Sequence, residues 1–206
     1  MENIPKLYKQ YYIDKNDERL ALFKLIKENY QIENGIYPGC FVHITPSFVI
    51  NNMTYVDSDK RILKFFRDPI TQKYIEEKKE YNTKPTIEFY QQAYSAMENT
   101  KLGNFDLLLS FYAGFISKYF KNHLKRGGIL LANNSHGDAS VAYLDNDYKF
   151  ISAIKRNGNN FKLITENLDQ YFKKKNGGPI DQNKIMEKMT GEKYILSPYA
   201  YVFKRR

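Results

Sequence analysis

The run FDLLLS, residues 105–110, constrains the fold of this chain more than any other stretch. Its apolar residues do not alternate with polar ones, as they would in a strand with one face in water. Continuous apolar runs of this kind are typical of strands buried on both faces of a parallel sheet. A parallel sheet needs long crossover connections, usually helices. The run therefore predicts an α/β protein with helices on both sides of a central sheet.

Strand-like and helical patterns alternate along the rest of the chain. Further strands are expected at residues 35–37, 53–56, 86–90, 129–132, 161–165 and 199–203. Helices are expected at residues 20–30, 60–66, 70–79, 117–124, 139–154 and 183–189. Asn16 or Asp17 can cap the first helix, and the basic-then-glycine sequence 125–128 is expected to end the fourth. This alternation predicts βαβ units in a three-layer, Rossmann-like fold.

Length and composition predict one well-buried domain in a reducing compartment. The 206 residues are 42% hydrophobic and 16% aromatic, enough for one core and short for two. We expect a single domain over residues 1–206, with residues 1–33 as a helical segment packed on it. No apolar stretch reaches the length of a membrane span, and the N-terminus lacks the apolar core of a signal peptide. A single cysteine, Cys40, excludes an internal disulfide framework, so we expect a cytoplasmic protein.

The formal net charge of +9 raises the question of a nucleic-acid partner. The lysines are scattered, apart from residues 173–175 and the basic tail 204–206. The chain is also rich in Lys, Asn, Ile, Tyr and Phe, a bias that an AT-rich genome imposes on any protein. A solvated basic surface is the simpler interpretation, and an anionic substrate or RNA stays an alternative.

Four predicted loops follow strands and have unusual contents. They are residues 38–46, 57–60, 110–115 and 133–140. In open α/β sheets, ligands bind beyond the carboxyl ends of the strands, near the point where the strand order reverses. We therefore expect a functional site to be built from these four loops.

The second loop carries the acidic sequence Asp57-Ser58-Asp59, 18 to 20 residues after Gly39. A carboxylate about 20 residues past a glycine turn is placed to accept hydrogen bonds from a ribose diol. The alternative is a helix N-cap, because a helix is predicted to begin here. One residue can cap while another binds, and Asp57, at the strand end, is the first candidate for the ribose.

The order of these features resembles the class I S-adenosylmethionine-dependent methyltransferases. FISKYFKNHLKRGGILL, residues 115–131, is similar to the family's helix that ends in Leu-Lys-Pro-Gly-Gly before the fifth strand. FDLLLS resembles the fourth strand, and YAYVFKRR, residues 199–206, resembles the closing antiparallel strand. The resemblance implies a mostly parallel, seven-stranded sheet with an antiparallel last strand. It also implies S-adenosylmethionine as cofactor and a methyl acceptor of unknown class as partner.

The glycine turn departs from the family pattern of an acidic residue followed by three alternating glycines. Aligned on Gly39, the chain has Tyr37 in the acidic position, and Phe41 and His43 in place of the other glycines. Glycine lets the backbone approach a cofactor closely, so Phe41 points away or narrows the pocket. The remaining cofactor-binding residues that the resemblance implies, besides residues 57–59, are Tyr37, Pro38, Gly39, Cys40, His43, Gln92 and Ser110.

The fourth loop, residues 133–138, contains only small or polar residues that can form hydrogen bonds. A turn needs one or two such residues, and helix capping by Ser135 or Asp138 is the structural alternative. His136 is one of only three histidines and lies where the resemblance places substrate, which makes it our candidate base. Tyr112 and Asn134 are candidate orienting groups.

Other chemistries have less support in the sequence. The chain has no phosphate-binding Gly-Lys-Ser/Thr turn and no Cys/His spacing suited to zinc, so we expect no metal. Cys40 and His43 are three residues apart, which is weak support for a nucleophile and base, and Cys40 is expected to be a small buried residue. The sequence favours a methyltransferase with a divergent cofactor pocket. The alternatives are a non-catalytic binding module of the same fold and a Rossmann dehydrogenase.

Overall fold

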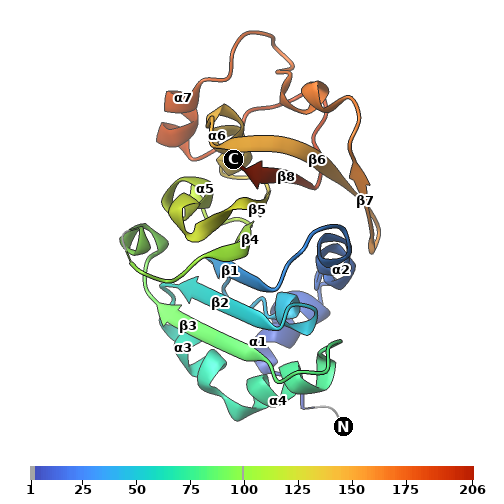
Figure 1. Ribbon diagram of the computed structural model, residues 1–206, viewed down its shortest axis with the longest axis vertical. Helices are drawn as coiled ribbons and strands as arrows, with labels where there is room; N and C mark the ends of the chain where they lie inside the picture. The colour runs from blue at the N-terminus through green and yellow to red at the C-terminus, as the bar shows by residue number, and fades with distance from the viewer. Residues whose placement is uncertain (1–2, 99) are drawn as a thin grey trace.

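The protein is built on one eight-stranded sheet with the strand order β3-β2-β1-β4-β5-β8-β6-β7. A computed structural model describes residues 3–98 and 100–206. In Figure 1 the sheet runs from β3, near the bottom, to β6 and β7, near the top, and helices lie to both sides of it. The α/β class and the three layers expected from the sequence are confirmed.

The elements alternate along the chain as the sequence patterns predict. The strands are β1 Asn34–Pro38, β2 Asn52–Asp57, β3 Thr86–Gln91, β4 Phe105–Ser110, β5 Leu124–Ala132, β6 Tyr148–Asn157, β7 Asn160–Ile164 and β8 Ala200–Arg205. The α-helices are α1 Lys6–Tyr8, α2 Leu20–Asn29, α3 Lys60–Arg67, α4 Pro69–Lys78, α5 Ile116–Tyr119, α6 Asp138–Leu144 and α7 Gln182–Lys188. A π-helical turn spans Lys9–Ile13, and 3₁₀ turns span Thr45–Phe48, Tyr94–Met97, Lys121–His123 and Leu168–Phe172.

The sheet is mostly parallel, with an antiparallel strand near one edge. Strands β3, β2, β1, β4 and β5 pair in parallel, and β8 pairs antiparallel with both β5 and β6. The antiparallel strand predicted at residues 199–203 is therefore confirmed. The predicted number of seven strands is wrong, because β6 forms within residues expected to be helical and continues into a hairpin with β7.

The helix predicted at residues 139–154 is wrong in its second half. Helix α6 ends at Leu144, and β6 begins at Tyr148. Asp145 ends the helix in an extended conformation, and its side chain accepts a hydrogen bond from the Asp147 backbone N–H at 2.9 Å. Such an aspartate turn satisfies the backbone locally and competes with helix propagation. The residues beyond it complete the sheet beside β8 instead.

The helix predicted at residues 117–124 is also shorter than expected. Helix α5 covers only Ile116–Tyr119, and Leu124 already pairs with Phe105 in the sheet. The sequence LKRGG is therefore not a helix stop but the first half of β5. The register shifts between Phe105 and Leu107, and Gly127 has a φ of +81°. A glycine with positive φ is typical of a strand irregularity of this kind.

Neither Asn16 nor Asp17 caps helix α2. The N-cap residue is Arg19, which has a left-handed backbone with a φ of 61° and forms no side-chain cap. Asp17 instead forms ion pairs with Arg19 and with Arg156, the latter at 2.7 Å. Two guanidinium partners compete with the helix end for this carboxylate. The Asp17 side chain therefore ties the N-terminal segment to β6.

Two hydrophobic cores lie on the two faces of the sheet. Leu107 and Leu109 belong to the core that includes α2, α3 and α4, whereas Leu108 belongs to the core that includes α5 and α6. All three leucines are fully buried. This alternation explains why three leucines follow one another in FDLLLS, since each face of the strand packs against a helical layer.

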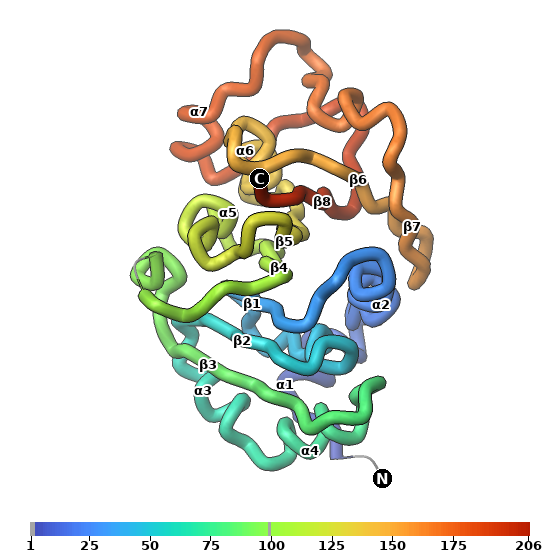
Figure 2. Tube along the Cα trace, in the orientation of Figure 1, coloured from blue at the N-terminus to red at the C-terminus, as the bar shows by residue number. Residues whose placement is uncertain are grey.

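The N-terminal segment packs on the core of the first face. Tyr8 and Phe23 are fully buried members of this core, and α2 contacts β7. The tube in Figure 2 shows the chain passing from α1, behind β2 and β3 in this view, to α2 beside the β6–β7 hairpin. The π-helical turn Lys9–Ile13 lies on this path, and π-helical turns are uncommon and frequent at functional sites. The prediction of one domain over residues 1–206 stays a prediction.

Candidate functional site

The candidate site lies at the carboxyl edge of the parallel strands. The chain passes from β1 to β2 and β3 in one direction along the sheet and from β4 to β5 in the other, so the order reverses between β1 and β4. All the sequence-predicted loops leave this edge, after Pro38, Asp57, Ser110 and Ala132. This reversal point is where open α/β sheets form a ligand-binding crevice.

The first loop closes directly against the third. Gly39 has a φ of +67°, and a Cβ built on it would lie 2.1 Å from the Cβ of Ala113. No larger residue fits here, because both the backbone conformation and the contact require glycine. The Gly39 N–H also donates to the Val56 carbonyl at 2.7 Å, which ties the end of β1 to β2. The glycine that the sequence singled out is used for close packing between protein loops.

Phe41 turns away from this contact and lies between a tyrosine and an arginine. Its φ is +46°, an uncommon conformation for a residue other than glycine. The ring centroid is 4.8 Å from that of Tyr11 and 5.0 Å from the guanidinium carbon of Arg61. These edge-to-face and cation–π contacts hold the side chain on the N-terminal segment. The Phe41 side chain therefore packs between the first loop and the residues Tyr11 and Arg61.

The acidic loop after β2 is held by backbone hydrogen bonds. The Asp57 carboxylate accepts from the Phe41 N–H at 2.8 Å and from the Asp59 N–H at 2.9 Å, one on each oxygen. Asp59 caps α3 by accepting from the Arg61 N–H at 2.9 Å, and the Arg61 guanidinium holds the pKa of Asp59 below its usual value. Ser58 is exposed. Capping by Asp59 leaves Asp57 as the group that could also accept from a ligand.

Other residues predicted at the cofactor loop lie in the core. Tyr37 and His43 are buried and hydrogen-bonded to each other at 3.3 Å, and the His43 ring stacks on Tyr12 at 4.2 Å. Burial and then the nearby Arg19 charge lower the pKa of His43 to about 3. Burial also raises the pKa of the Cys40 thiol well above its usual value. These side chains are neutral packing groups.

Pro38 and Gln92 differ in their access to solvent. Pro38 is buried at the end of β1, whereas Gln92 is exposed just after β3. Beyond Gln92 the chain folds back, and the Tyr94 hydroxyl lies 2.4 Å from where a Cβ on Gly114 would be. The β3 end of the edge thus packs against the loop after β4, with Gln92 outside that contact.

A buried carboxylate joins the loops after β4 and β5. Asp138 accepts hydrogen bonds from the Ser110 and Ser117 hydroxyls and from the Ser117 N–H. Burial raises the pKa of Asp138 to about 6, although these donors act in the opposite direction. The Ser110 hydroxyl, which the resemblance implied as a cofactor contact, thus donates a hydrogen bond to Asp138. Asp138 was expected only as a helix cap.

The loop after β5 combines internal hydrogen bonds with one unsatisfied donor. The Asn133 oxygen accepts from the Ser135 hydroxyl at 3.1 Å and from the Tyr112 N–H at 3.4 Å. Its Nδ2 atom is buried and lacks a hydrogen-bond partner among the described residues. An unsatisfied buried donor costs about 1–3 kcal/mol, so a partner is expected to meet it. The sequence pointed to this loop without singling out Asn133 as a binding group.

The three candidate catalytic residues have different surroundings. Tyr112 is 56% exposed and has a φ of +60°. Asn134 is partly buried and accepts from the Ser140 N–H at 3.0 Å, which fixes the loop on α6. His136 is partly exposed, and its Nδ1 lies 3.0 Å from the Ser135 hydroxyl. Tyr112 and His136 are therefore open to solvent, whereas Asn134 has a structural role in addition to any orienting one.

Arg19 is a further residue of this edge that the sequence analysis did not identify. Its guanidinium carbon lies 5.4 Å from the Phe111 ring and 5.5 Å from the Tyr112 ring. Its Nε atom and the Tyr199 hydroxyl are buried without a hydrogen-bond partner among the described residues. Its location in a polar stretch before a helix offered no signal, because stacking on the β4 loop depends on the tertiary fold.

Known proteins of this architecture were found by structure and not by sequence. No protein-family model matches the chain, and no curated protein matches it. A methyltransferase from Geobacter sulfurreducens superposes with a TM-score of 0.52 at 13% identity, over 77% of this chain and 86% of that one. Cofactor-bound Rv0187 from MTB superposes with a TM-score of 0.50 at 8% identity, over 71% of this chain and 77% of that one. The O-methyltransferase from Bacillus cereus in complex with SAH superposes with a TM-score of 0.49 at 11% identity, over 70% of this chain and 77% of that one.

The first two of these similarities define the class of the fold. The chain has the Rossmann-like fold of class I S-adenosylmethionine-dependent methyltransferases. Identities this low show the fold alone. Two further findings concern the described residues 3–98 and 100–206: none of their helices has the length and apolar character of a membrane span, and no three of their His, Cys, Asp and Glu side chains form a metal-binding group.

Proposed function

We propose that this protein binds S-adenosylmethionine at the carboxyl edge of its sheet and transfers the methyl group to an acceptor held by the loops after β4 and β5. The observation that carries the proposal is the placement of Asp57 and the 133–138 loop on the two sides of the β1–β4 reversal point, in a methyltransferase fold. The Asn133 Nδ2 atom, which lacks a partner among the described residues, supports a ligand on the β5 side.

The nucleoside part of the cofactor fits the residues after β2 and β3. The two backbone N–H groups that bind Asp57 orient its carboxylate, and each oxygen keeps a second lone pair for a ribose hydroxyl. Gln92 is exposed beside it and offers an amide to the edge of a base. With the exposed Ser58, these two residues belong to the part of the predicted cofactor set that stays accessible to a ligand.

The methionine part of the cofactor needs a movement of the loop after β4. Gly39 and Ala113 are in contact where this part must pass, so the two loops must separate. The third loop has backbone conformations suited to a hinge, because Tyr112 and Gly114 have φ values of +60° and +89°. Opening at residues 111–114 is therefore part of the proposal.

The residues of the β4–β5 side would act on the acceptor. The bound cofactor supplies an activated methyl group on a positively charged sulfur. His136 takes the proton from the acceptor nucleophile, and the Ser135 hydroxyl beside Nδ1 orients its ring. Tyr112 and Asn133 position the acceptor, so most of the rate acceleration comes from alignment.

A second candidate is a non-catalytic module of the same fold. The specific observation that favours it is the closed first half of the edge, where Ala113 fills the space over Gly39 and both Asp57 oxygens already have backbone partners. Such a module keeps the fold and the surface loops without a cofactor.

Isothermal titration with S-adenosylmethionine and S-adenosylhomocysteine separates the two candidates. We expect micromolar to submillimolar binding that Asp57→Ala weakens at least about tenfold, the loss of a charge-assisted hydrogen bond. Ala113→Gly removes the Cβ over Gly39 and should strengthen binding. Asp169→Ala, which removes an exposed carboxylate from the 3₁₀ turn Leu168–Phe172, is the matched control. Failure to bind at millimolar concentration, with Ala113→Gly equally inert, would reject the enzyme and favour the module.

A further inference from the structure

A long groove lies between the N-terminal segment and helices α3 and α4, away from the loops after β4 and β5. Its volume is about 900 Å³, which falls within the range of small-molecule sites. One wall is formed by residues 3–7 and Lys9, and the other by residues of α3 and the start of α4. The N-terminal wall is the segment that continues into the π-helical turn Lys9–Ile13.

The floor of the groove is apolar. Ile4, Leu7, Phe65 and Ile70 line it, and Ile70 is 42% exposed although it is a large aliphatic residue. Exposed aliphatic surface in a concave site favours a ligand with an apolar part. Four apolar side chains in one groove of this volume provide the contacts that an alkyl chain needs.

The rim of the groove is strongly basic. Among the residues that the structure describes, five lysines or arginines and a single carboxylate, Asp68, line it. Lys9 pairs with Asp14, Arg61 pairs with Asp59, and Asp68 caps α4 by accepting from the Ile70 N–H. The other three cations, Lys6, Lys60 and Lys64, have no acidic partner within residues 3–98 and 100–206. The groove therefore carries uncompensated positive charge above an apolar floor.

Two of these three lysines repel each other. Lys60 and Lys64 are four residues apart on α3, where like charges destabilise a helix by a few tenths of a kcal/mol. Lys6, on α1, lines the same groove. An anion bound near these lysines offsets the repulsion, which gives the groove a physical reason to bind one.

We propose that this groove binds an amphiphilic anion, an unbranched alkyl chain that ends in a carboxylate or phosphate. The chain lies along Ile4, Leu7, Phe65 and Ile70, and the headgroup meets Lys6, Lys60 and Lys64. This site adjoins the loop after β2, and the proposal does not depend on the proposed methyl transfer. Arg61 connects the two regions, because it lines the groove and also stacks on Phe41.

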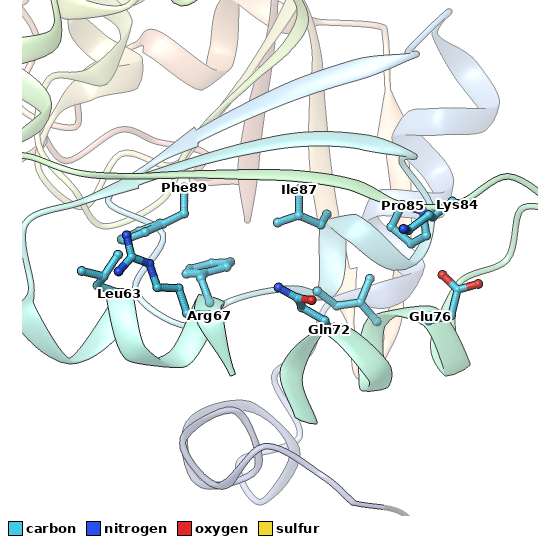
Figure 3. A pocket seen from close by; sticks show the side chains of 10 residues that line it. Leu63, Arg67, Gln72, Glu76, Lys84, Pro85, Ile87 and Phe89 are labelled. Carbon is cyan, nitrogen blue, oxygen red and sulfur yellow. The ribbon is translucent and has the colours of Figure 1, made fainter. Parts of the chain in front are cut away.

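A neighbouring cavity provides an internal comparison. It measures about 390 Å³ and lies between α3, α4 and the edge strand β3 (Figure 3). Figure 3 shows Arg67 and Glu76 at its two ends and Ile87 and Phe89 pointing into it from β3. Opposite charges line this cavity, so it lacks the one-sided charge of the groove and is less suited to an anionic headgroup.

The test is calorimetric titration of the full chain with decanoate, decyl phosphate and decanol at low salt, all below their micelle concentrations. We expect saturable binding of the two anions, with decanol about tenfold weaker because it lacks the headgroup charge. Shortening decanoate to octanoate should weaken binding by up to about 15-fold, or about fourfold per methylene. A preference between decanoate and decyl phosphate identifies the headgroup.

Variants locate the site and keep the proposal open to contradiction. Lys64→Glu and Ile70→Glu should each weaken decanoate binding at least about fivefold, and both change exposed side chains that a folded protein tolerates. Lys73→Glu makes the same charge change on α4 outside the groove and is the control. Equal binding of decanol and decanoate, equal effects of Lys73→Glu and Lys64→Glu, or loss of binding only in Ile87→Glu would overturn the proposal. Absence of saturable binding to the unchanged protein would also overturn it.

Discussion

The two halves of the carboxyl edge differ in how fully the protein itself satisfies their side chains and polar groups. In the half formed by the loops after β1 and β2, side chains and backbone donors are satisfied by the protein itself: Phe41 lies against Tyr11 and Arg61, and Asp57 accepts from two N–H groups. In the half formed by the loops after β4 and β5, Tyr112 is exposed and the Asn133 Nδ2 atom lacks a partner among the described residues.

The difference indicates where this chain departs from its fold class. A glycine-rich turn leaves open backbone for a cofactor, whereas this first loop uses its glycine to contact Ala113. In the second half, the buried Asn133 Nδ2 atom lacks a partner among the described residues, and such a group is costly unless a ligand meets it. A methyl-transfer function would thus depend on moving the loop after β4 away from Gly39 while the loop after β5 keeps its polar groups in place.

The largest expected effect comes from adding one methyl group to the closed half. Gly39→Ala should lower the free energy of unfolding by about 2–4 kcal/mol, from left-handed strain and from overlap with Ala113. Gly177→Ala is the control, because its φ of +71° is similar and its surroundings are open, so only about 1 kcal/mol is expected. Urea denaturation measures both. Equal losses would mean that the Gly39–Ala113 contact relaxes freely, and the first half would not be closed as described.

The next largest expected effect is a fall of the unfolding free energy as the pH falls, caused by a histidine in the closed half. The folded-state pKa of His43 is about 3, below the unfolded value of about 6.5, so protonation favours the unfolded chain as the pH falls. Between pH 7 and pH 5 His43 should contribute a loss of about 2 kcal/mol in unfolding free energy. The difference between the pH profiles of the unchanged protein and His43→Gln reports this loss.

Gly177→Ala is the control for that comparison, because it changes no titrating group. It should shift the whole pH profile of unfolding without changing its slope. A His43→Gln profile with the same slope as the unchanged protein would show that the His43 ring is accessible to protons in the folded state.

In the second half, a smaller change of the unfolding free energy with pH is expected, and it has the opposite sign. Asp138 has a folded-state pKa of about 6, above its unfolded value, so the folded chain binds more protons and loses stability as the pH rises. The loss should be about 1.3 kcal/mol between pH 5 and pH 7. Asp138→Asn should abolish it, because the amide keeps an acceptor for Ser117 and does not titrate. Persistence of the slope in this variant would assign it to another group.

The smallest effect on stability is expected at the accessible histidine. His136→Ala should change the unfolding free energy by less than about 0.5 kcal/mol and leave cofactor affinity unchanged. Under the proposed function it should lower methyl transfer by about 100-fold or more, the usual contribution of a general base. A loss of cofactor affinity equal to that of Asp57→Ala would place His136 in the cofactor half and break the distinction between the two halves.

Much of the edge could be predicted because strand ends and loop chemistry are local properties. The strand ends at Pro38, Asp57 and Ser110 follow from apolar runs that stop at polar or turn residues. The interpretation of LKRGG as a helix stop was wrong because basic residues and glycines also suit a strand irregularity. The helix over 139–154 was wrong because an aspartate turn at Asp145 competes with a helical pattern over a short range.

By itself, the sequence determined the alternation of strands and helices, the burial of FDLLLS on both faces and the set of loops at one edge. These depend on periodicity and turn chemistry, which act over a few residues. Only the tertiary structure decided that Arg19 lies on Phe111 and Tyr112, and that Ala113 closes over Gly39. Both contacts join segments more than 70 residues apart, and their geometry comes from the packing of whole elements.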